Sequence, residues 1–447
     1  MLSDPIAALA TAPGRAALAM VRLSGTGAFQ VAARVAQGFR PGLARQAVLA
    51  RFLDPAGRPI DRGIVIAYPG PRSYTGEDLV EFSCHGGATV PAQLLAALCG
   101  AGARLAAPGE FTRRAVLNGK LDLVQAEAVG DLVDAAAPAQ ARAAIHQVEG
   151  GLSRRIAGLR EQLLELTALL SYQIDFPEED DGPIRPEQLL ALLDQAEHAM
   201  TDLVGTAPAG ERLRRGALVV LAGRPNSGKS SLFNALVGTE RALVTPLPGT
   251  TRDTIEADTD FDGWPIRLAD TAGLRDTEEM VERLGIEVSR RYLAAADLVL
   301  LCVEAGRDLE PGEREIQRDQ AMILVRTKAD LAAPHPDREV EGIPVSVVTG
   351  EGVGALRTAV AERLFGGAGE FPVPDLEPVL LRERHRVALE QAAGELREAR
   401  PHLGVQGDAA LAAHHIRRAL ADLDALLGSV DVDQVLDRVF SRFCVGK

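Results

Sequence analysis

The segment Gly223-Arg-Pro-Asn-Ser-Gly-Lys-Ser-Ser231 constrains the fold of this chain more than any other part of the sequence. An apolar run over 217–222 comes just before it and predicts a buried strand, and a helical pattern over 231–237 follows it. The segment matches G-x-x-x-x-G-K-[ST], in which glycines let the backbone wrap a phosphate so that N–H groups and a helix N-terminus point at it. Strand, loop and helix together predict a phosphate-binding loop.

The residue types in this loop predict how a nucleotide is held. We expect Lys229 to reach the β- and γ-phosphates and the Ser230 hydroxyl to bind Mg²⁺. The loop residues expected to contact the nucleotide are Asn226, Ser227, Gly228, Lys229, Ser230 and Ser231.

Three later segments indicate which nucleotide binds. Asp270-Thr-Ala-Gly273 follows an apolar run over 265–269. We expect the Asp270 carboxylate to help hold Mg²⁺ and the Gly273 backbone N–H to contact the γ-phosphate. Thr327-Lys-Ala-Asp330 follows a run over 322–326 and resembles N-K-x-D, with Thr in place of Asn. Asp330 would accept hydrogen bonds from guanine N1–H and the 2-amino group, which adenine lacks. The order and spacing of these motifs predict a Ras-like GTPase. The further expected contacts are Asp270, Thr271, Ala272, Gly273, Thr327, Lys328, Ala329, Asp330, Ser346, Val347 and Val348.

The segment between the phosphate loop and Asp270 is expected to supply a switch. Gly249-Thr-Thr-Arg-Asp253 carries Thr251 as the expected Mg²⁺ ligand, although a polar turn is the simpler interpretation. We expect GTP contacts from this segment at Thr245, Pro246, Leu247, Pro248, Gly249, Thr250 and Thr251.

The composition limits the class of protein. A chain of 447 residues with 47% apolar and 25% charged residues is expected to form about three globular domains. No stretch approaches the ~20 apolar residues that span a membrane, and the first residues do not resemble a secretory signal. Four scattered cysteines favour a reducing, cytoplasmic setting. A net charge of −14 argues against loose electrostatic coating of nucleic acid, so contact with RNA needs a local basic patch or a partner.

Helical and strand patterns divide the chain. The predicted fold class is multidomain α/β, with an N-terminal α+β domain, a discontinuous helical bundle and an inserted Ras-like P-loop GTPase domain. The inserted domain would be held by two linkers and free to move. The expected domains are 1–118 (N-terminal), 119–211 (helical, first part), 212–370 (GTPase) and 371–447 (helical, second part).

Motifs outside the GTPase domain are more distinctive. They include Thr11-Ala-Pro-Gly-Arg15, Ser73-Tyr-Thr-Gly-Glu-Asp78, His85-Gly-Gly87, Pro108-Gly-Glu-Phe-Thr-Arg-Arg-Ala115 and the C-terminal Phe443-Cys-Val-Gly-Lys447. With their order over essentially the whole chain, they closely resemble the bacterial tRNA modification GTPase family MnmE, also called TrmE. The resemblance implies modification of the C5 position of wobble uridine in certain tRNAs, giving a carboxymethylaminomethyl-type group. It also implies a complex with the FAD-dependent partner MnmG (GidA), as a heterotetramer.

The resemblance further implies that the N-terminal domain is folate-binding-like and makes the homodimer. It would bind 5-formyl-tetrahydrofolate or a related one-carbon folate, with Arg22, Glu81, Lys120 and Lys447 matching the contacting positions. Without the family, each of these would be an ordinary surface charge. Cys444 matches a residue linked to modification, although a buried thiol is the more frequent fate of a lone cysteine.

In Ras-like GTPases a Gln just after D-x-x-G usually orients the attacking water. Leu274 stands at that position here, so catalysis needs another group. The resemblance implies Glu282 as the base, acting through a water, with Asp270 and Lys229 as further catalytic residues. From spacing alone, Glu282 would be a solvated helix charge. The resemblance also implies that K⁺ stimulates hydrolysis as the two GTPase domains approach across the dimer, bound by Asn226, Thr245, Leu247 and Thr250.

Two alternatives stay open. A ribosome-associated assembly GTPase would share the nucleotide motifs but usually appends a Lys/Arg-rich RNA-binding module, and none is visible here. Arginine-rich spots at 212–215, 382–386 and 414–418 would form a tRNA-facing stripe or simply solvated helix faces.

Overall fold

The computed structural model describes residues 4–175, 186–238, 255–270, 291–331, 341–366, 379–403, 407–428 and 446. It divides into two compact units, one made of 1–130 with 424–447 and one made of 131–423. Among the helices of these ranges, none combines the length and the apolar character needed to span a bilayer.

The first unit is an α+β domain built on a seven-stranded sheet in the order β3-β4-β5-β6-β2-β1-β7. All neighbouring strands are antiparallel except β1 and β7, which are parallel. Its elements are β1 (Ile6–Leu9), β2 (Leu18–Ser24), α1 (Ala28–Val35), β3 (Ala36–Gln37), β4 (Val48–Leu53), β5 (Pro59–Tyr68), β6 (Leu79–His85), α2 (Val90–Gly100), β7 (Arg104–Leu105), α3 (Glu110–Leu117) and α4 (Leu123–Asp134).

Strict alternation explains why β2 has two different faces. Ala19, Val21 and Leu23 are buried in a core with residues of α1 and α2, whereas Met20 and Arg22 between them face the other way. This second face therefore carries the predicted ligand residues of β2 and β6.

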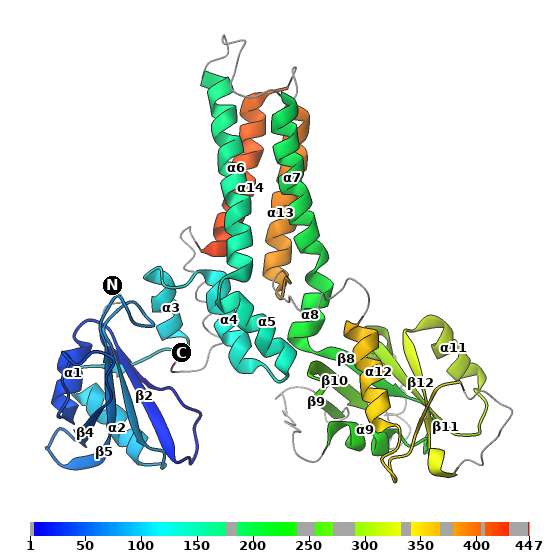
Figure 1. Cartoon of the computed structure of the whole chain (residues 1–447), viewed down its shortest axis with the longest axis horizontal. Helices are drawn as coiled ribbons and strands as arrows, with labels where there is room; N and C mark the ends of the chain where they lie inside the picture. The colour runs from blue at the N-terminus through cyan, green and yellow to red at the C-terminus, as the bar shows by residue number, and fades with distance from the viewer. Residues whose placement is uncertain are drawn as a thin grey trace, which may run out of the picture. The chain divides into compact units, whose positions relative to one another are not determined.

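The second unit contains helices and a second sheet. Figure 1 shows α6, α7, α13 and α14 as four long neighbouring helices, and α8 leads through Gly216 directly into the sheet. The helices are α5 (Pro138–Val148), α6 (Gly151–Asp175), α7 (Pro186–Gly205), α8 (Ala207–Arg215), α13 (Glu383–Ala399) and α14 (Ala409–Leu427), with a short 3₁₀ turn η3 (Arg400–His402).

The inserted domain has a six-stranded sheet in the order β13-β12-β11-β8-β10-β9, parallel except for the β9–β10 hairpin. All six residues of β8 are buried, as expected for a central parallel strand covered on both faces. The elements are β8 (Ala217–Ala222), α9 (Lys229–Val237), β9 (Ile255–Phe261), β10 (Trp264–Asp270), β11 (Leu298–Glu304), α11 (Pro311–Asp319), β12 (Met322–Thr327), η2 (Ala329–Leu331), β13 (Ile343–Val345) and α12 (Val353–Phe365).

The inserted domain is joined to the helices by more than linkers. Ala139 and Ala143 of α5 and Leu213 of α8 belong to the same apolar core as Phe261 and other residues of the sheet. The Ala139 N–H also donates to the Gly263 carbonyl at the tip of the β9–β10 hairpin, at 3.0 Å. The expectation of a domain held only by two linkers is therefore wrong for this structure, because packing surface is shared at its base.

Candidate nucleotide-binding site

The phosphate loop lies between β8 and α9 with the backbone geometry that its sequence predicts. Gly223, Asn226 and Gly228 have φ of 140°, 63° and 85°, and two of the three are glycine, which enters this region without steric cost. A Cβ on Gly223 would lie 2.4 Å from the carbonyl oxygen of Cys302 in β11, so no larger residue fits there. The loop is thus held closely against the neighbouring strand.

Lys229 is buried, and its charge is satisfied by the loop itself. Its Nζ donates to the carbonyl oxygens of Gly223 at 2.9 Å and Arg224 at 2.6 Å. These neutral acceptors keep the ammonium inside the curve of the loop. A phosphate oxygen would be a stronger partner, because its negative charge adds Coulomb attraction to the hydrogen bond from the ammonium group.

Two side chains with oxygen atoms that could bind a metal ion meet at the start of α9. The Ser230 hydroxyl donates to the Asp270 carboxylate at 2.8 Å. Asp270 ends β10, which pairs in parallel with β8, so the strand order brings the two residues together across 40 positions of sequence. A hydroxyl and a carboxylate are hard oxygen ligands of the kind that Mg²⁺ prefers, so this pair fits the expected ion.

The expected base-reading residues follow β12. Thr327 is 2% exposed, and its hydroxyl donates to the Ser227 carbonyl oxygen at 2.8 Å. Lys328 has φ of 55° and its Nζ pairs with Glu304, whose pKa is lowered by that hydrogen bond and charge. Asp330 lies in the exposed turn η2. Glu304 was not predicted as part of the site, because nothing in its local sequence marks it as the partner of Lys328.

The loop after β13 supplies the last expected base contacts. Ser346 is fully buried, and its hydroxyl accepts a hydrogen bond from the Thr349 N–H at 3.2 Å. Val348 is 86% exposed. The turn is therefore stabilised by its own serine, while the valine side chain projects into solvent.

Several expected site residues lie outside the described ranges. These are the switch segment Thr245, Pro246, Leu247, Pro248, Gly249, Thr250 and Thr251, the segment Thr271, Ala272, Gly273 and Glu282, and the C-terminal Cys444 and Lys447.

Two of the expected folate residues lie together in the first unit. Arg22 of β2 and Glu81 of β6 are cross-strand partners, and the Arg22 guanidinium binds one Glu81 oxygen at 2.9 and 3.2 Å. The Tyr68 hydroxyl donates to the other Glu81 oxygen at 3.2 Å. Arg22 also lies 5.5 Å from the ring centroid of Tyr74. The result is a partly buried charged pair with an aromatic side wall.

Lys120 and the end of the chain belong to the same unit. A Cβ on Gly76 would lie 3.2 Å from Lys120 Cγ, so the lysine stem packs on the 73–78 loop. Gly446 is buried, and a Cβ on it would lie 2.3 Å from the carbonyl oxygen of Leu9 in β1. Because Leu9 pairs with Val21, the C-terminal motif reaches β1 one strand away from Arg22.

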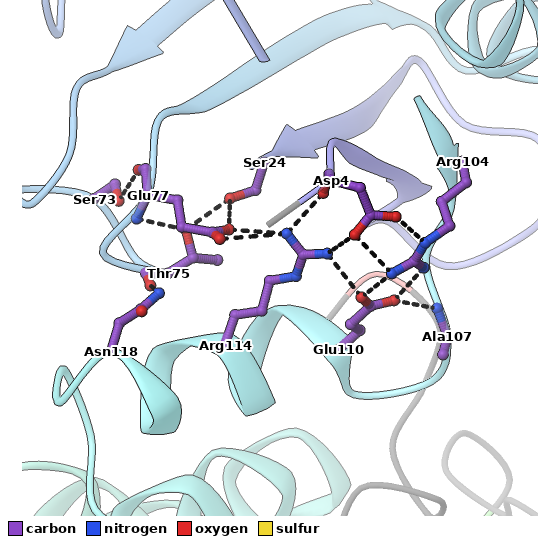
Figure 2. A network of polar contacts seen from close by, with 10 residues as sticks. All are labelled: Asp4, Ser24, Ser73, Thr75, Glu77, Arg104, Ala107, Glu110, Arg114 and Asn118. Carbon is purple, nitrogen blue, oxygen red and sulfur yellow. Dashed lines mark hydrogen bonds and ion pairs between the residues drawn. The ribbon is translucent and has the colours of Figure 1, made fainter. Parts of the chain in front are cut away.

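The same unit contains a network of charged side chains around the buried Arg114 that sequence reasoning missed (Figure 2). Arg114 of α3 is 1% exposed and contacts Glu77 at 3.1 Å, Glu110 at 2.9 Å and both the backbone and the carboxylate of Asp4. Arg104 binds Asp4 and Glu110, each at 2.6 Å. Burial would raise the pKa of Glu110, but hydrogen bonds from Arg104, the Ala107 N–H and Arg114 outweigh it and lower the pKa to about 2. The network ties the chain start to α3 and the 73–78 loop.

Many arginines of the expected tRNA-facing stripe are paired with carboxylates. Arg382 binds Asp131 at 2.7 Å, Arg386 binds Glu383 and Glu390, and Arg418 binds Glu395 at 2.9 Å. These pairs favour the interpretation of solvated and bridging helix faces for these positions.

Known protein families and relatives resemble this chain over nearly its whole length. The model of the MnmE helical domain matches residues 123–444, and that of the GTP-binding protein TrmE N-terminus matches residues 5–120. The chain is similar to a tRNA modification GTPase MnmE of Thermus thermophilus, with 43% identity covering 100% of this chain and 99% of the relative. It is 39% identical to that of Salinibacter ruber over 100% and 99%, and 42% identical to that of Leptothrix cholodnii over 99% of each.

Proposed function

Because the chain belongs to the tRNA modification GTPase MnmE family, we propose that it hydrolyses GTP to GDP to drive modification of wobble uridine at C5 in certain tRNAs. The product would carry a carboxymethylaminomethyl-type group, and the chemistry would be shared with an FAD-dependent partner of the MnmG (GidA) type. The observation that supports GTP hydrolysis best is the meeting of Lys229, Ser230 and Asp270 around the phosphate loop.

The described residues supply most of the phosphate-binding chemistry. Lys229 would exchange its two backbone carbonyls for β- and γ-phosphate oxygens, and loop N–H groups would hold the same phosphates. Ser230, with Thr251, would hold Mg²⁺, and Asp270 would orient that shell from the end of β10. A bound Mg²⁺ neutralises charge that develops between the phosphates.

Activation of water is assigned to Glu282, since Leu274 cannot orient it. K⁺ would be bound by Asn226, Thr245, Leu247 and Thr250 when two GTPase domains approach. Asn226 is exposed and held at φ of 63°, which supports a side chain offered to a ligand instead of one packed in the core.

The first unit would bind the one-carbon folate. The Arg22–Glu81 pair offers both a guanidinium and a carboxylate to a polar heterocycle, and Tyr74 offers an aromatic wall. The position of Gly446 beside β1 supports the inclusion of Lys447 in this site, and Cys444 would act in modification from the same tail.

A homodimer formed by the first unit fits the outer face of its sheet. Leu18, Leu49 and Ile64 are 62%, 57% and 43% exposed on the face that α1 and α2 leave uncovered. The dimer would bind its flavoprotein partner as a heterotetramer and act in the cytoplasm.

The experiment that tests this function compares tRNA nucleosides by mass spectrometry. Cells lacking the chain are complemented with the wild type or with Asp270→Ala. We expect the C5-modified wobble uridine to disappear in the deletion, return with the wild type and stay absent with D270A. An unchanged nucleoside profile in the deletion would refute the modification role. GTP-dependent co-sedimentation with a ribosomal subunit would then support the assembly GTPase.

A further inference from the structure

Thr327 makes a contact that its motif position does not predict. It begins the Thr327-Lys-Ala-Asp330 segment, where Asn is usual, yet its hydroxyl donates to the carbonyl oxygen of Ser227 in the phosphate loop. The bond measures 2.8 Å, is buried, and joins residues 100 positions apart. It connects the end of β12 to the loop one residue before Gly228 and two before Lys229.

A threonine hydroxyl has a single hydrogen to donate. Since the Ser227 carbonyl takes that hydrogen, none is left for an acceptor on a base. We propose that Thr327 is a positioning residue of the phosphate loop, and that it sets nucleotide affinity without reading the base. This inference rests on the proposed binding of GTP.

Geometry of the peptide bond explains how the contact would act. The Ser227 carbonyl and the Gly228 N–H belong to one planar trans peptide, so they point in opposite directions. Fixing the carbonyl toward β12 therefore aims the Gly228 N–H away from β12. Backbone N–H groups of such loops are the groups that bind phosphate, so one hydrogen bond outside the loop orients one donor.

Among the described residues, the other hydrogen bond of Ser227 is made by its backbone N–H. The residue is 3% exposed, and its hydroxyl lacks a hydrogen-bond partner within the described ranges. Its N–H donates to the Arg224 carbonyl at 3.3 Å, which is a long bond. That N–H lies in the preceding peptide, so within the described part of the chain it is the Thr327 hydroxyl that orients the carbonyl of the Ser227–Gly228 peptide.

Thr327 also completes a pattern across the sheet. The end of β11 touches the loop through the Cys302 carbonyl against Gly223, and the end of β10 through Asp270 and Ser230. The end of β12 contributes Thr327. The two strands that flank β8 and the next strand beyond β11 thus each position one part of the loop, at its start, at its metal-binding serine and at the peptide between them.

The test uses full-length protein with GDP and with inosine diphosphate, which lacks the 2-amino group that Asp330 would recognise. Thr327→Val keeps the shape and removes the hydroxyl, whereas Thr327→Ser keeps the hydroxyl. We expect T327V to weaken both nucleotides by the same factor, about tenfold, and T327S to recover most of the affinity. Thr358→Val is the matched control, because it removes an exposed hydroxyl bond to Asp262 elsewhere in the same domain.

The outcomes separate this role from its alternatives. Equal affinity of T327V and wild type would overturn the proposal, and so would a changed ratio of the two nucleotides, which would mean that Thr327 contacts the base. Fluorescence of Trp264, the single tryptophan, reports whether the domain is folded. If T327V does not fold, Thr327→Ala replaces it under the same criteria. Failure of the wild type to bind GDP would refute the proposed GTP binding itself.

Discussion

The Arg114 network and the phosphate loop both bury positive charge, but they satisfy it in opposite ways. Arg114 contacts the carboxylates of Asp4, Glu77 and Glu110, which are acidic partners supplied by the fold itself. Lys229 is also buried, and two neutral carbonyls of its own loop accept hydrogen bonds from its ammonium group.

This difference separates a charge that stabilises the fold from a charge held ready for a ligand. Removing one member of a buried ion network takes a charged partner from the others in a medium of low polarity, which is costly. Exchanging a carbonyl for a phosphate costs little and strengthens the lysine's interactions. We therefore expect substitutions in the Arg114 network to change the stability of the fold, and substitution of Lys229 to change activity.

The largest expected effect is on the stability of the first unit. Arg114→Met removes the positive charge at the centre of its network. Unfolding of that unit should become easier by about 3–5 kcal/mol, because three carboxylates lose their shared partner. Far-UV circular dichroism should show an early transition in urea, while Trp264 fluorescence, which reports the other unit, stays at its wild-type midpoint. Arg58→Met, which removes a 79%-exposed arginine from the same unit, is the control. A shift of R114M no larger than that of R58M would contradict the structural role of the network.

Lys229→Ala should give the converse result. We expect GTP hydrolysis to fall by roughly 10²–10³-fold, the cost of removing one donor aimed at developing charge. The Trp264 unfolding midpoint without nucleotide should change little, since water can replace the lysine as the donor to the carbonyls of Gly223 and Arg224. A large loss of stability without nucleotide would remove the distinction between the two clusters.

The network should also respond to acid. The pKa of Glu110 is about 2 in the folded chain against an ordinary value of 4.5. Its ionised form therefore contributes stability that is complete above about pH 4.5 and is lost as the pH falls toward 2, by up to roughly 3 kcal/mol. Glu110→Gln should flatten this part of the stability profile of the first unit, measured by urea unfolding between those limits. Parallel profiles for E110Q and wild type would show that Glu110 does not govern the acid response.

Local signals in the sequence predicted the phosphate loop well. The strand expected over 217–222 is β8 with the same bounds, and the strand expected over 265–269 is β10, one residue longer at each end. These elements are specified by short-range apolar runs and glycines. The helical segment expected over 119–211 begins with three separate helices, α4, α5 and α6, where Pro138 begins one helix and Gly150, at φ of 84°, precedes another.

Long-range partners were not predictable in the same way. Arg114 and Asp4 are 110 residues apart, and Thr327 and Ser227 are 100 apart, so no periodicity or spacing connects them. The motif around Arg114 was recognisable as distinctive, but its role depends on which carboxylates the sheet order brings to it. The shared core of α5, α8 and the inserted sheet was missed for the same reason.

The smallest expected effect concerns Arg386 on α13, which contrasts with both buried clusters. It pairs with Glu383 and Glu390 on its own helix, and all three side chains are substantially exposed. Such exposed pairs contribute little to stability, so Arg386→Ala should move the unfolding midpoint little. Because two carboxylates already neutralise the guanidinium, its removal should also change tRNA affinity by less than about threefold.

Arg382→Ala is the informative neighbour for this measurement. Its guanidinium binds both oxygens of Asp131, and both side chains are largely buried, so the stability loss should clearly exceed that of R386A. Binding is measured with unmodified tRNA at two salt concentrations, since a phosphate contact changes the salt dependence. If R386A weakens tRNA binding more than tenfold and flattens its salt dependence, the arginine leaves its carboxylates for phosphate. Arg386 would then resemble Lys229, a charge held by exchangeable partners, in spite of its exposed position.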